Sequence, residues 1–368
     1  MTDKGKNKGE ISELYTFIKL LKDGKIYAAD ENLNRLADDM YLPIIKIRRE
    51  EKDLGTLDYY TGNSEEPVIK IFHNGSFVKA VSVEEFDIQA VCLYHALMSS
   101  DKGTKSIEDI GNLKSFLEDI FVKKVKAGNK EKADIVLEIF DVYTGFKSLE
   151  GFSIKSQMGS ASTLFNASKS TNFAYKLQGV TDEIMYQVNT IDTHNKFKDR
   201  MKLLRDNNVT FEFCGMRSQV FRNNLILIDS LLPTIFAEAL KYYYVEGIDT
   251  CTAIVEKLCE RNPLGYEVTW IYQYKIQRFL AASALGMVAA TPWNGIDEAS
   301  GGYIVVKSDG DIVAIYLRNR NVFEKYLLNT TKFDKPDSKP KRCDYGYVYK
   351  NEHGEYFMDL NLQIRFQA

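Results

Sequence analysis

Two alternating segments, residues 134–140 and 152–157, constrain the fold of this chain more than any other part of its sequence. Side chains of a β-strand point alternately to its two faces. Ile135, Leu137 and Ile139 share one face of the first segment, and Phe152 and Ile154 share one face of the second; Val136 and Phe140 lie on the other face of the first segment, with Asp134 and Glu138. Thr144-Gly145 lies between the segments, so they predict a hairpin over residues 133–159. Pairing the strands can bring Asp134 onto the same face as Ser153, Lys155 and Gln157, and the register that would decide its nearest neighbour stays open.

Helical and extended patterns alternate along the rest of the chain. Helices are predicted for residues 8–23, 82–98, 106–125, 181–189 and 195–206, for most of 222–286, and as a single turn for 162–168. Strands or hairpins are predicted for residues 67–81, 171–178, 208–213, 301–317 and 356–366, with Asn74-Gly75 and Asp309-Gly310 as turns. Residues 330–350 are polar and contain proline, which predicts a loop. The fold class is therefore α/β or α+β, with a mixed sheet flanked by helices.

The chain is long enough for one large domain with insertions or for two domains. It has 368 residues, of which 45% are hydrophobic and 27% charged. This composition supports a sizeable core. We predict a first part, residues 1–220, that holds the hairpin 133–159. A second part, residues 221–368, would combine helices with a β-rich end, and the two could also form one continuous domain.

Charge, cysteines and histidines exclude few functions. The net charge is −3, which argues against a polycation but allows a local basic surface for nucleic acid. The five cysteines and four histidines are scattered without zinc spacing, so free buried thiols are expected. No apolar run is long enough to cross a membrane, and the polar, lysine-rich start does not resemble a signal peptide. A cytoplasmic protein is therefore expected.

Asp134 and Lys155 on adjoining strands suit metal-assisted hydrolysis of a phosphodiester. A carboxylate oxygen is a good Mg²⁺ ligand, and a bound metal stabilises phosphate charge and lowers the pKa of its water. The lysine can orient that water and stabilise developing negative charge. The alternative is a solvent-facing salt bridge on a hairpin, which is common.

Two glutamates of the first predicted helix strengthen the metal hypothesis. Glu10 lies within the apolar arc of that helix, and Glu13 lies at its edge. A carboxylate on the buried side of a helix is costly unless it is paired or binds a metal. Alternatively, Glu10 occupies the first turn, where the helix dipole favours it.

Several stretches resemble known nucleases. "DIVL" followed by "SIK" about twenty residues later resembles the PD-(D/E)XK nuclease core. The stretches "KGEISELYTFIKLLKDGKIYAADENLN", "YLPIIKIRRE", "GFSIKSQMGSASTLFNAS", "TNFAYKL", "LLNTTKF" and "LNLQIRF" together resemble type II restriction endonucleases of the HpaII family. The resemblance covers residues 8–366. It implies Mg²⁺-dependent cleavage of double-stranded DNA at a short palindrome, with CCGG cut after the first C as the candidate site. It also implies residues 1–220 as the nuclease core and 221–368 as contributing to recognition.

Carried over to this sequence, the resemblance assigns Asp134 and Lys155 to the motif aspartate and lysine. Ser153 departs from the motif, because it stands where the pattern has Asp or Glu, and a hydroxyl is a poor Mg²⁺ ligand. Glu13 is the first candidate for the missing carboxylate, followed by Glu10 and then Glu150. The backbone carbonyl of Ile154 would be a further metal ligand, and Gln157 could hold a water molecule.

Donor-rich stretches are candidates for DNA contact, although each could equally be a solvated loop or helix end. They contain Ser160, Ser162, Thr163, Asn166, Arg217, Gln219, Arg222, Arg318, Asn319, Arg320, Asn329, Lys332, Lys341 and Arg342. Arginine recognises guanine with two hydrogen bonds, but the sequence does not separate base contacts from phosphate contacts.

Three hypotheses follow. The first is a type II restriction endonuclease, for which a palindromic target makes a homodimer natural and a cognate DNA methyltransferase is expected. The second is a nuclease of the same core with another DNA substrate. The third is a DNA-binding protein that kept the fold and lost catalysis, and Ser153 is the feature that favours it.

Overall fold

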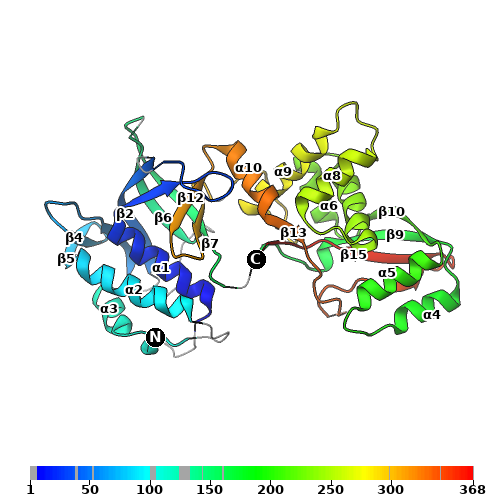
Figure 1. Cartoon of the computed structure of the whole chain (residues 1–368), viewed down its shortest axis with the longest axis horizontal. Coiled ribbons are helices and arrows are strands. Elements are labelled where there is room, and N and C mark those ends of the chain that lie inside the picture. The colour runs from blue at the N-terminus through cyan, green and yellow to red at the C-terminus, as the bar shows by residue number, and fades with distance from the viewer. Residues whose placement is uncertain are drawn as a thin grey trace. The chain divides into compact units, whose positions relative to one another are not determined.

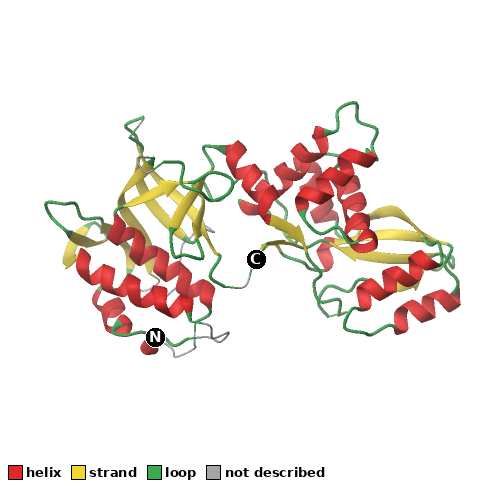
Figure 2. Cartoon of the chain, viewed as in Figure 1, coloured by secondary structure: helices red, strands yellow, loops and turns green. Residues whose placement is uncertain are grey.

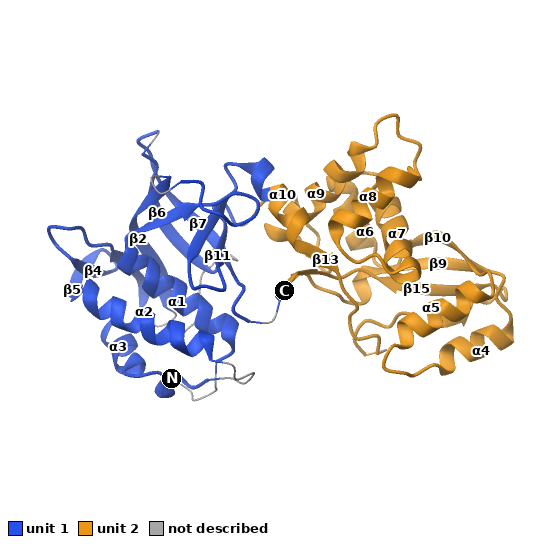
Figure 3. Cartoon of the chain, in the orientation of Figure 1, with its two compact units in different colours: residues 1–162, 298–323, 368 blue, residues 163–297, 324–367 orange. Residues whose placement is uncertain are grey.

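A computed structural model describes residues 6–37, 40–51, 54–99, 105–123, 133–142, 144–159, 161–297, 299–339 and 341–367. The chain divides into two compact units (Figure 3). Unit 1 comprises residues 1–162 and 298–323, and unit 2 comprises residues 163–297 and 324–367. The expected boundary at residue 220 therefore falls inside unit 2. The assignment of nuclease and recognition roles to parts of the chain stays a prediction.

Unit 1 is built on a mixed nine-stranded sheet (Figures 1 and 2). Its strand order is β1-β12-β11-β7-β6-β2-β3-β4-β5, and β1 also pairs with β2. β1 runs parallel to β12, and β11 runs parallel to β7, while the other pairs are antiparallel. The strands are β1 (Lys25–Ala28), β2 (Tyr41–Glu51), β3 (Gly55–Tyr60), β4 (Val68–His73), β5 (Ser76–Ser82), β6 (Ile135–Phe140), β7 (Lys147–Ser156), β11 (Gly302–Val306) and β12 (Ile312–Tyr316).

Helices α1 (Lys8–Asp23) and α2 (Val83–Met98) cover one face of this sheet, together with α3 (Leu113–Asp119) and the 3₁₀ turn η1 (Ile107–Asp109). The helix limits follow local chemistry. Asn7 and Glu10 form a capping box at the start of α1. Gly24, with φ of 64°, ends α1 in the left-handed conformation that glycine adopts without strain.

Unit 2 contains a four-stranded sheet, β10-β9-β15-β14, and a three-stranded sheet, β13-β16-β8. Both are antiparallel. The strands are β8 (Thr163–Phe165), β9 (Asn172–Gln178), β10 (Thr210–Met216), β13 (Thr331–Phe333), β14 (Val348–Lys350), β15 (Tyr356–Asn361) and β16 (Ile364–Phe366).

The helices of unit 2 pack around these sheets (Figure 2). They are η2 (Lys169–Thr171), α4 (Asp182–Thr190), α5 (Lys196–Asp206), α6 (Gln219–Ile228), α7 (Leu232–Lys241), the π-helical turn η3 (Tyr242–Glu246), α8 (Cys251–Arg261) and α9 (Trp270–Ala284). Helix α10 (Arg320–Thr330) begins in unit 1 and continues in unit 2. Tyr175 of β9 is fully buried and donates a hydrogen bond of 2.7 Å to the carbonyl of Ala237 in α7, so α7 covers one face of the four-stranded sheet.

The mixed α and β class and both predicted glycine turns are confirmed, but four local predictions are wrong. Residues 163–165 form a strand instead of a helical turn, because they pair with β16. The predicted loop 330–350 has strands at both ends, and the predicted strand 356–366 is two strands in separate sheets. Cys214 is exposed, although all five cysteines are free as expected. In the described ranges, no helix has the length and apolar character needed to cross a bilayer.

Candidate active site

The predicted catalytic hairpin is present as β6 and β7. Ile135 pairs with Phe152, and the ladder continues to Phe140 and Lys147. The apolar face is buried as predicted: Ile135, Leu137, Ile139 and Phe152 are at most 4% exposed, and Ile154 is 9% exposed. Ser153 and Lys155 alternate with these residues and are half-buried. The motif lysine therefore lies on β7, and the motif aspartate lies directly before the adjoining strand β6.

Asp134 immediately precedes β6 and is fixed against β7. Its N–H donates to the carbonyl of Phe152 at 2.9 Å, and its Oδ2 accepts the N–H of Ile154 at 2.9 Å. The register that the sequence left open thus gives Asp134 a backbone partner between Ser153 and Lys155. A carboxylate held on a rigid strand in this way is oriented before any ligand arrives.

The oxygen atoms of Asp134 and Ile154 fit a hard divalent cation. The N–H and C=O of one strand residue point to the same edge, so the carbonyl of Ile154 lies on the edge that its N–H shares with Asp134. Carboxylate and backbone carbonyl oxygens are the ligands that Mg²⁺ and Ca²⁺ prefer. Among the described residues there is no cluster of three or more Asp, Glu, His or Cys suited to a metal. A metal site here would therefore combine Asp134 with Ile154 and with one further carboxylate or water.

Lys155 lies on the face opposite to Phe152 and Ile154, next to β11. Ser153 pairs with Tyr303, and Lys155 pairs with Val305. The Nζ atom of Lys155 is 5.0 Å from the centroid of the Tyr303 ring. Tyr303 is 1% exposed and packs edge-on against Phe323, at 5.3 Å between ring centroids. Tyr303 thus limits the positions open to the ammonium group.

The glutamates of α1 occupy different environments. Glu10 Oε2 accepts the N–H of Asn7 at 3.0 Å, and Lys6 lies 3.9 Å from Oε1, so the first-turn alternative for Glu10 agrees with the structure. Glu13 is half-buried, and its Oε2 is shielded from solvent. Ser12 donates to the hydroxyl of Ser156 at 2.9 Å, which places α1 on the face of Phe152 and Ile154. A metal-binding Glu13 would have to reach Asp134 at the start of β6, and this role stays a prediction.

A carboxylate that the sequence reasoning missed lies on β2. Arg48 of β2 pairs with Val136 of β6. Continuing this register by two residues brings Glu50 level with Asp134. Glu50 accepts a hydrogen bond of 2.8 Å from the Thr56 hydroxyl. No local pattern in the sequence shows that β2 neighbours β6, and only that neighbour relation connects Glu50 with the site.

A cluster of charged residues extends from Glu138 of β6 across the neighbouring strands β2 and β3. Lys46 Nζ lies 3.0 Å from Asp58 and 3.3 Å from Glu138, and Arg48 donates two hydrogen bonds to Asp58 at 2.8 and 3.0 Å. Lys46 and Asp58 are each 8% exposed. Burial raises the pKa of Asp58, but hydrogen bonds and charges from Arg48 and Lys46 outweigh it and hold the pKa below its usual value.

Gln157 is exposed beyond the end of β7, where its N–H donates to the carbonyl of Val306 at 2.9 Å. Ser160 lies outside the described residues. The catalytic and metal-ligand candidates Glu10, Glu13, Asp134, Glu150, Ser153, Ile154, Lys155 and Gln157 all belong to unit 1. The predicted DNA contacts are divided between the units. Ser162, Arg318, Asn319 and Arg320 belong to unit 1, whereas Thr163, Asn166, Arg217, Gln219, Arg222, Asn329, Lys332, Lys341 and Arg342 belong to unit 2.

Several of these candidates have partners within the protein. Arg318 pairs with Asp141. Asn319 Oδ1 accepts the N–H of Val322 at 3.4 Å, which caps α10. Lys332 lies in β13 opposite Arg365. Arg222, Lys341 and Arg342 are exposed. None of these contacts tests a role in DNA binding, so the roles stay predictions.

Comparison with known proteins identifies the class of this enzyme. Residues 7–366 match the family described as HpaII restriction endonuclease. The chain is also 36% identical over 363 residues to the type II restriction enzyme HpaII of Haemophilus parainfluenzae, and the match covers 98% of each chain. No solved structure matches. The protein is a type II restriction endonuclease. It belongs to the HpaII restriction endonuclease family, which confirms the resemblance inferred from its motifs.

Proposed function

We propose that this enzyme cleaves both strands of DNA at a short palindrome, CCGG being the first candidate, in a reaction that requires Mg²⁺ and leaves 5′-phosphate ends. The observation that carries the proposal is the hydrogen bond from the Ile154 N–H to the Asp134 carboxylate, which joins the motif aspartate to the strand of the motif lysine. On this basis we also assign unit 1 to the PD-(D/E)XK fold.

The residues of the hairpin divide the work of hydrolysis. Asp134 and the Ile154 carbonyl would hold the cation, with Glu13 or Glu50 in place of the motif carboxylate that Ser153 lacks. When bound, the cation would stabilise charge on the scissile phosphate and lower the pKa of a water molecule. Lys155 would orient the attacking water and stabilise the negative charge that develops on the phosphate oxygens. Tyr303 would restrict the ammonium group to this task.

A digest of unmethylated plasmid DNA tests the proposal. The purified protein is assayed with Mg²⁺ and with EDTA, beside Lys155→Ala, and the ends of the products are sequenced. We expect discrete Mg²⁺-dependent fragments that end at one palindrome and are absent with the variant. Intact plasmid with the wild type, on methylated and unmethylated DNA alike, would reject cleavage and leave a DNA-binding protein as the alternative.

The class of enzyme also implies its cellular setting. A nuclease that cuts a four-base site would destroy the DNA of its own cell, so we propose that a methyltransferase of the same specificity protects that DNA. We place the enzyme in the cytoplasm, where both the host DNA and incoming DNA are accessible.

A further inference from the structure

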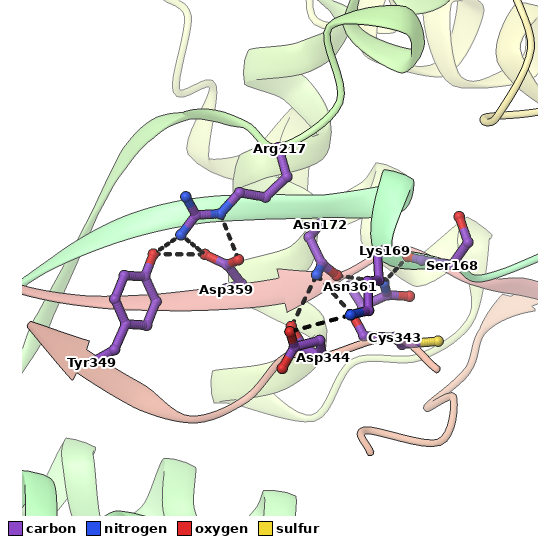
Figure 4. Close-up of polar contacts among 9 residues, drawn as sticks. All are labelled: Ser168, Lys169, Asn172, Arg217, Cys343, Asp344, Tyr349, Asp359 and Asn361. Carbon is purple, nitrogen blue, oxygen red and sulfur yellow. Dashed lines mark hydrogen bonds and ion pairs between the residues drawn. The ribbon is translucent and has the colours of Figure 1, made fainter. Parts of the chain in front are cut away.

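Arg217 is the centre of a polar cluster in unit 2 (Figure 4). Its Nε and Nη2 atoms donate to the two carboxylate oxygens of Asp359, at 2.7 and 3.0 Å. Nη2 also donates to the hydroxyl of Tyr349, and that hydroxyl donates to Asp359 at 3.0 Å. The guanidinium carbon lies 5.2 Å from the centroid of the Tyr349 ring. One edge of the guanidinium group is therefore fully engaged.

The groups that hold Arg217 are rigid. Asp359 belongs to β15, pairs with Ala174 of β9 and is 7% exposed. The N–H of Arg217 donates to the carbonyl of Asn172 at 3.0 Å, just after β10 ends. The side chain of Asn172 donates to the carbonyls of Cys343 and Asp344 at 2.8 and 3.0 Å, which ties the segment before β14 to the same place. The guanidinium group thus has a fixed position before any ligand binds.

Arg217 also lines an open cavity. The hydrogens of Nη1 have no acceptor within the described part of the chain, and the Arg217 side chain is 47% exposed. Arg217, Asn172 and Asp359 line a cavity of about 590 Å³ together with the aromatic rings of Tyr345, Tyr347 and Tyr349. This face of the sheet is opposite to the one that Tyr175 and α7 occupy, because Asp359 and Tyr175 alternate in register.

The charge balance of the cavity favours a neutral ligand. Arg217 is neutralised by Asp359, and Lys169 lies 3.6 Å from Asp344 at the other end of the cavity. A phosphate would meet both carboxylates, whereas the edge of a guanine base offers a neutral acceptor, N7, to a hydrogen of Nη1. The geometry points to Arg217 as the residue that recognises a guanine of the target site, with Asp359 and Tyr349 as positioning residues. This inference rests on the proposed function, since it assumes a DNA target that contains guanine.

The test combines protein variants with altered bases. The palindrome found in the plasmid digest is placed in short labelled duplexes, and 7-deazaguanine, which lacks N7 but keeps its base pair, replaces each guanine in turn. Dissociation constants are measured with Ca²⁺ in place of Mg²⁺. We expect one replacement to weaken wild-type binding about tenfold or more. Arg217→Ala and Arg217→Lys should bind the parent duplex more weakly than the wild type does. The 7-deazaguanine replacement that weakens wild-type binding should cause no further loss of affinity in these two variants. In Asp359→Asn, the loss of affinity caused by that replacement should be smaller than in the wild type.

Arg261 provides a matched control. It donates to both oxygens of Glu246 at 2.7 and 3.0 Å, lies 5.1 Å from the Tyr242 ring centroid and is also 47% exposed, but it does not line this cavity. Arg261→Ala should keep the wild-type penalty at every guanine. Melting temperatures of all variants show whether they are folded.

Two outcomes would overturn the inference. An unchanged 7-deazaguanine penalty in Arg217→Ala, with weaker binding to every duplex, would make Arg217 a phosphate contact. If the wild-type protein bound every 7-deazaguanine duplex as tightly as the parent duplex, Arg217 would also be rejected as the guanine contact. If the wild type neither cut nor preferred any sequence, the proposed function would fail first, and the guanine assignment would fail with it.

Discussion

The carboxylate of Asp134 accepts the Ile154 N–H and is also the proposed ligand of the cation. A single substitution separates these two roles. In Asp134→Asn the amide oxygen can still accept the Ile154 N–H, so the hairpin should keep its register. The negative charge that would bind the cation is lost. We expect cleavage to fall at least about a thousandfold, and we expect Mg²⁺ to raise the melting temperature of the wild type but not that of the variant. The measurements are plasmid cleavage and thermal unfolding with and without Mg²⁺.

The ligand in place of the motif carboxylate can be found by comparing Glu13→Gln with Glu50→Gln. Each variant keeps the shape of the side chain and removes its charge. The variant of the true ligand should need more Mg²⁺ for half-maximal cleavage, by about tenfold or more, in line with the loss of one charged oxygen ligand. The other variant serves as its control. If both glutamines had the wild-type Mg²⁺ requirement, neither glutamate would bind the cation.

Asp58 should make the stability of unit 1 depend on acid pH. Because folding lowers the pKa of this carboxyl group, its ion pairs stabilise the fold above the unfolded-state pKa of about 4. The stabilisation is lost as the pH falls through the lower, folded-state pKa. Asp58→Asn leaves the buried Lys46 with fewer partners, so we expect it to cost about 3 kcal/mol at pH 7. The difference from the wild type should shrink below pH 4.

Urea unfolding at pH 7 and at pH 3 to 4 measures this effect. Glu66→Gln is the control, because the Lys70–Glu66 pair is exposed and should contribute little to the free energy of unfolding. Equal losses in the two variants at pH 7 would show that the Asp58 cluster is no more stabilising than a surface ion pair.

At the scale of elements, two hairpin turns differ in what surrounds their glycines. Gly75 and Gly310 both have positive φ, 83° and 81°. A Cβ on Gly75 would meet no atom within 4 Å, whereas a Cβ on Gly310 would lie 2.4 Å from the ring of Tyr94. The carbonyl of Gly310 also accepts a hydrogen bond of 2.7 Å from the buried hydroxyl of Tyr15. The β11–β12 turn is therefore part of the core contact with α1 and α2.

Alanine substitutions should report this difference. Gly75→Ala should cost about 1 kcal/mol, the strain of a left-handed conformation with a side chain. Gly310→Ala adds a steric overlap and should cost about 3 kcal/mol. Urea unfolding of the two variants tests both values. Similar losses would mean that the turn moves away from Tyr94 without cost.

These elements also show how far the sequence could predict the fold. The Asn74-Gly75 and Asp309-Gly310 turns, the end of α1 before Gly24 and the alternation of β6 and β7 depend on neighbouring residues, so they were predicted. Strand order depends on contacts between distant segments. Tyr303 lies beside Lys155 because β11 neighbours β7, and Glu50 lies level with Asp134 because β2 neighbours β6. No local sequence pattern shows either neighbour relation. Residues 163–165 form a strand for the same reason, because their partner is β16.

At the scale of the whole molecule, the number of active sites limits how one chain can cut a duplex. Each chain carries one Asp134–Lys155 pair, and a palindrome presents two equivalent phosphates related by a twofold axis. Cutting both at the same time therefore requires two chains. The net charge of −3 also means that binding depends on local basic surfaces and should weaken with salt.

We therefore expect two chains on one palindromic duplex. Light scattering of the complex, formed with Ca²⁺, should give a mass of two chains and one duplex, and a duplex with half the site should bind more weakly. On supercoiled plasmid at limiting enzyme, the linear product should form without accumulation of nicked circles. A complex with the mass of one chain, together with a nicked intermediate that builds up and then decays, would show instead that a single chain cuts the two strands in separate events.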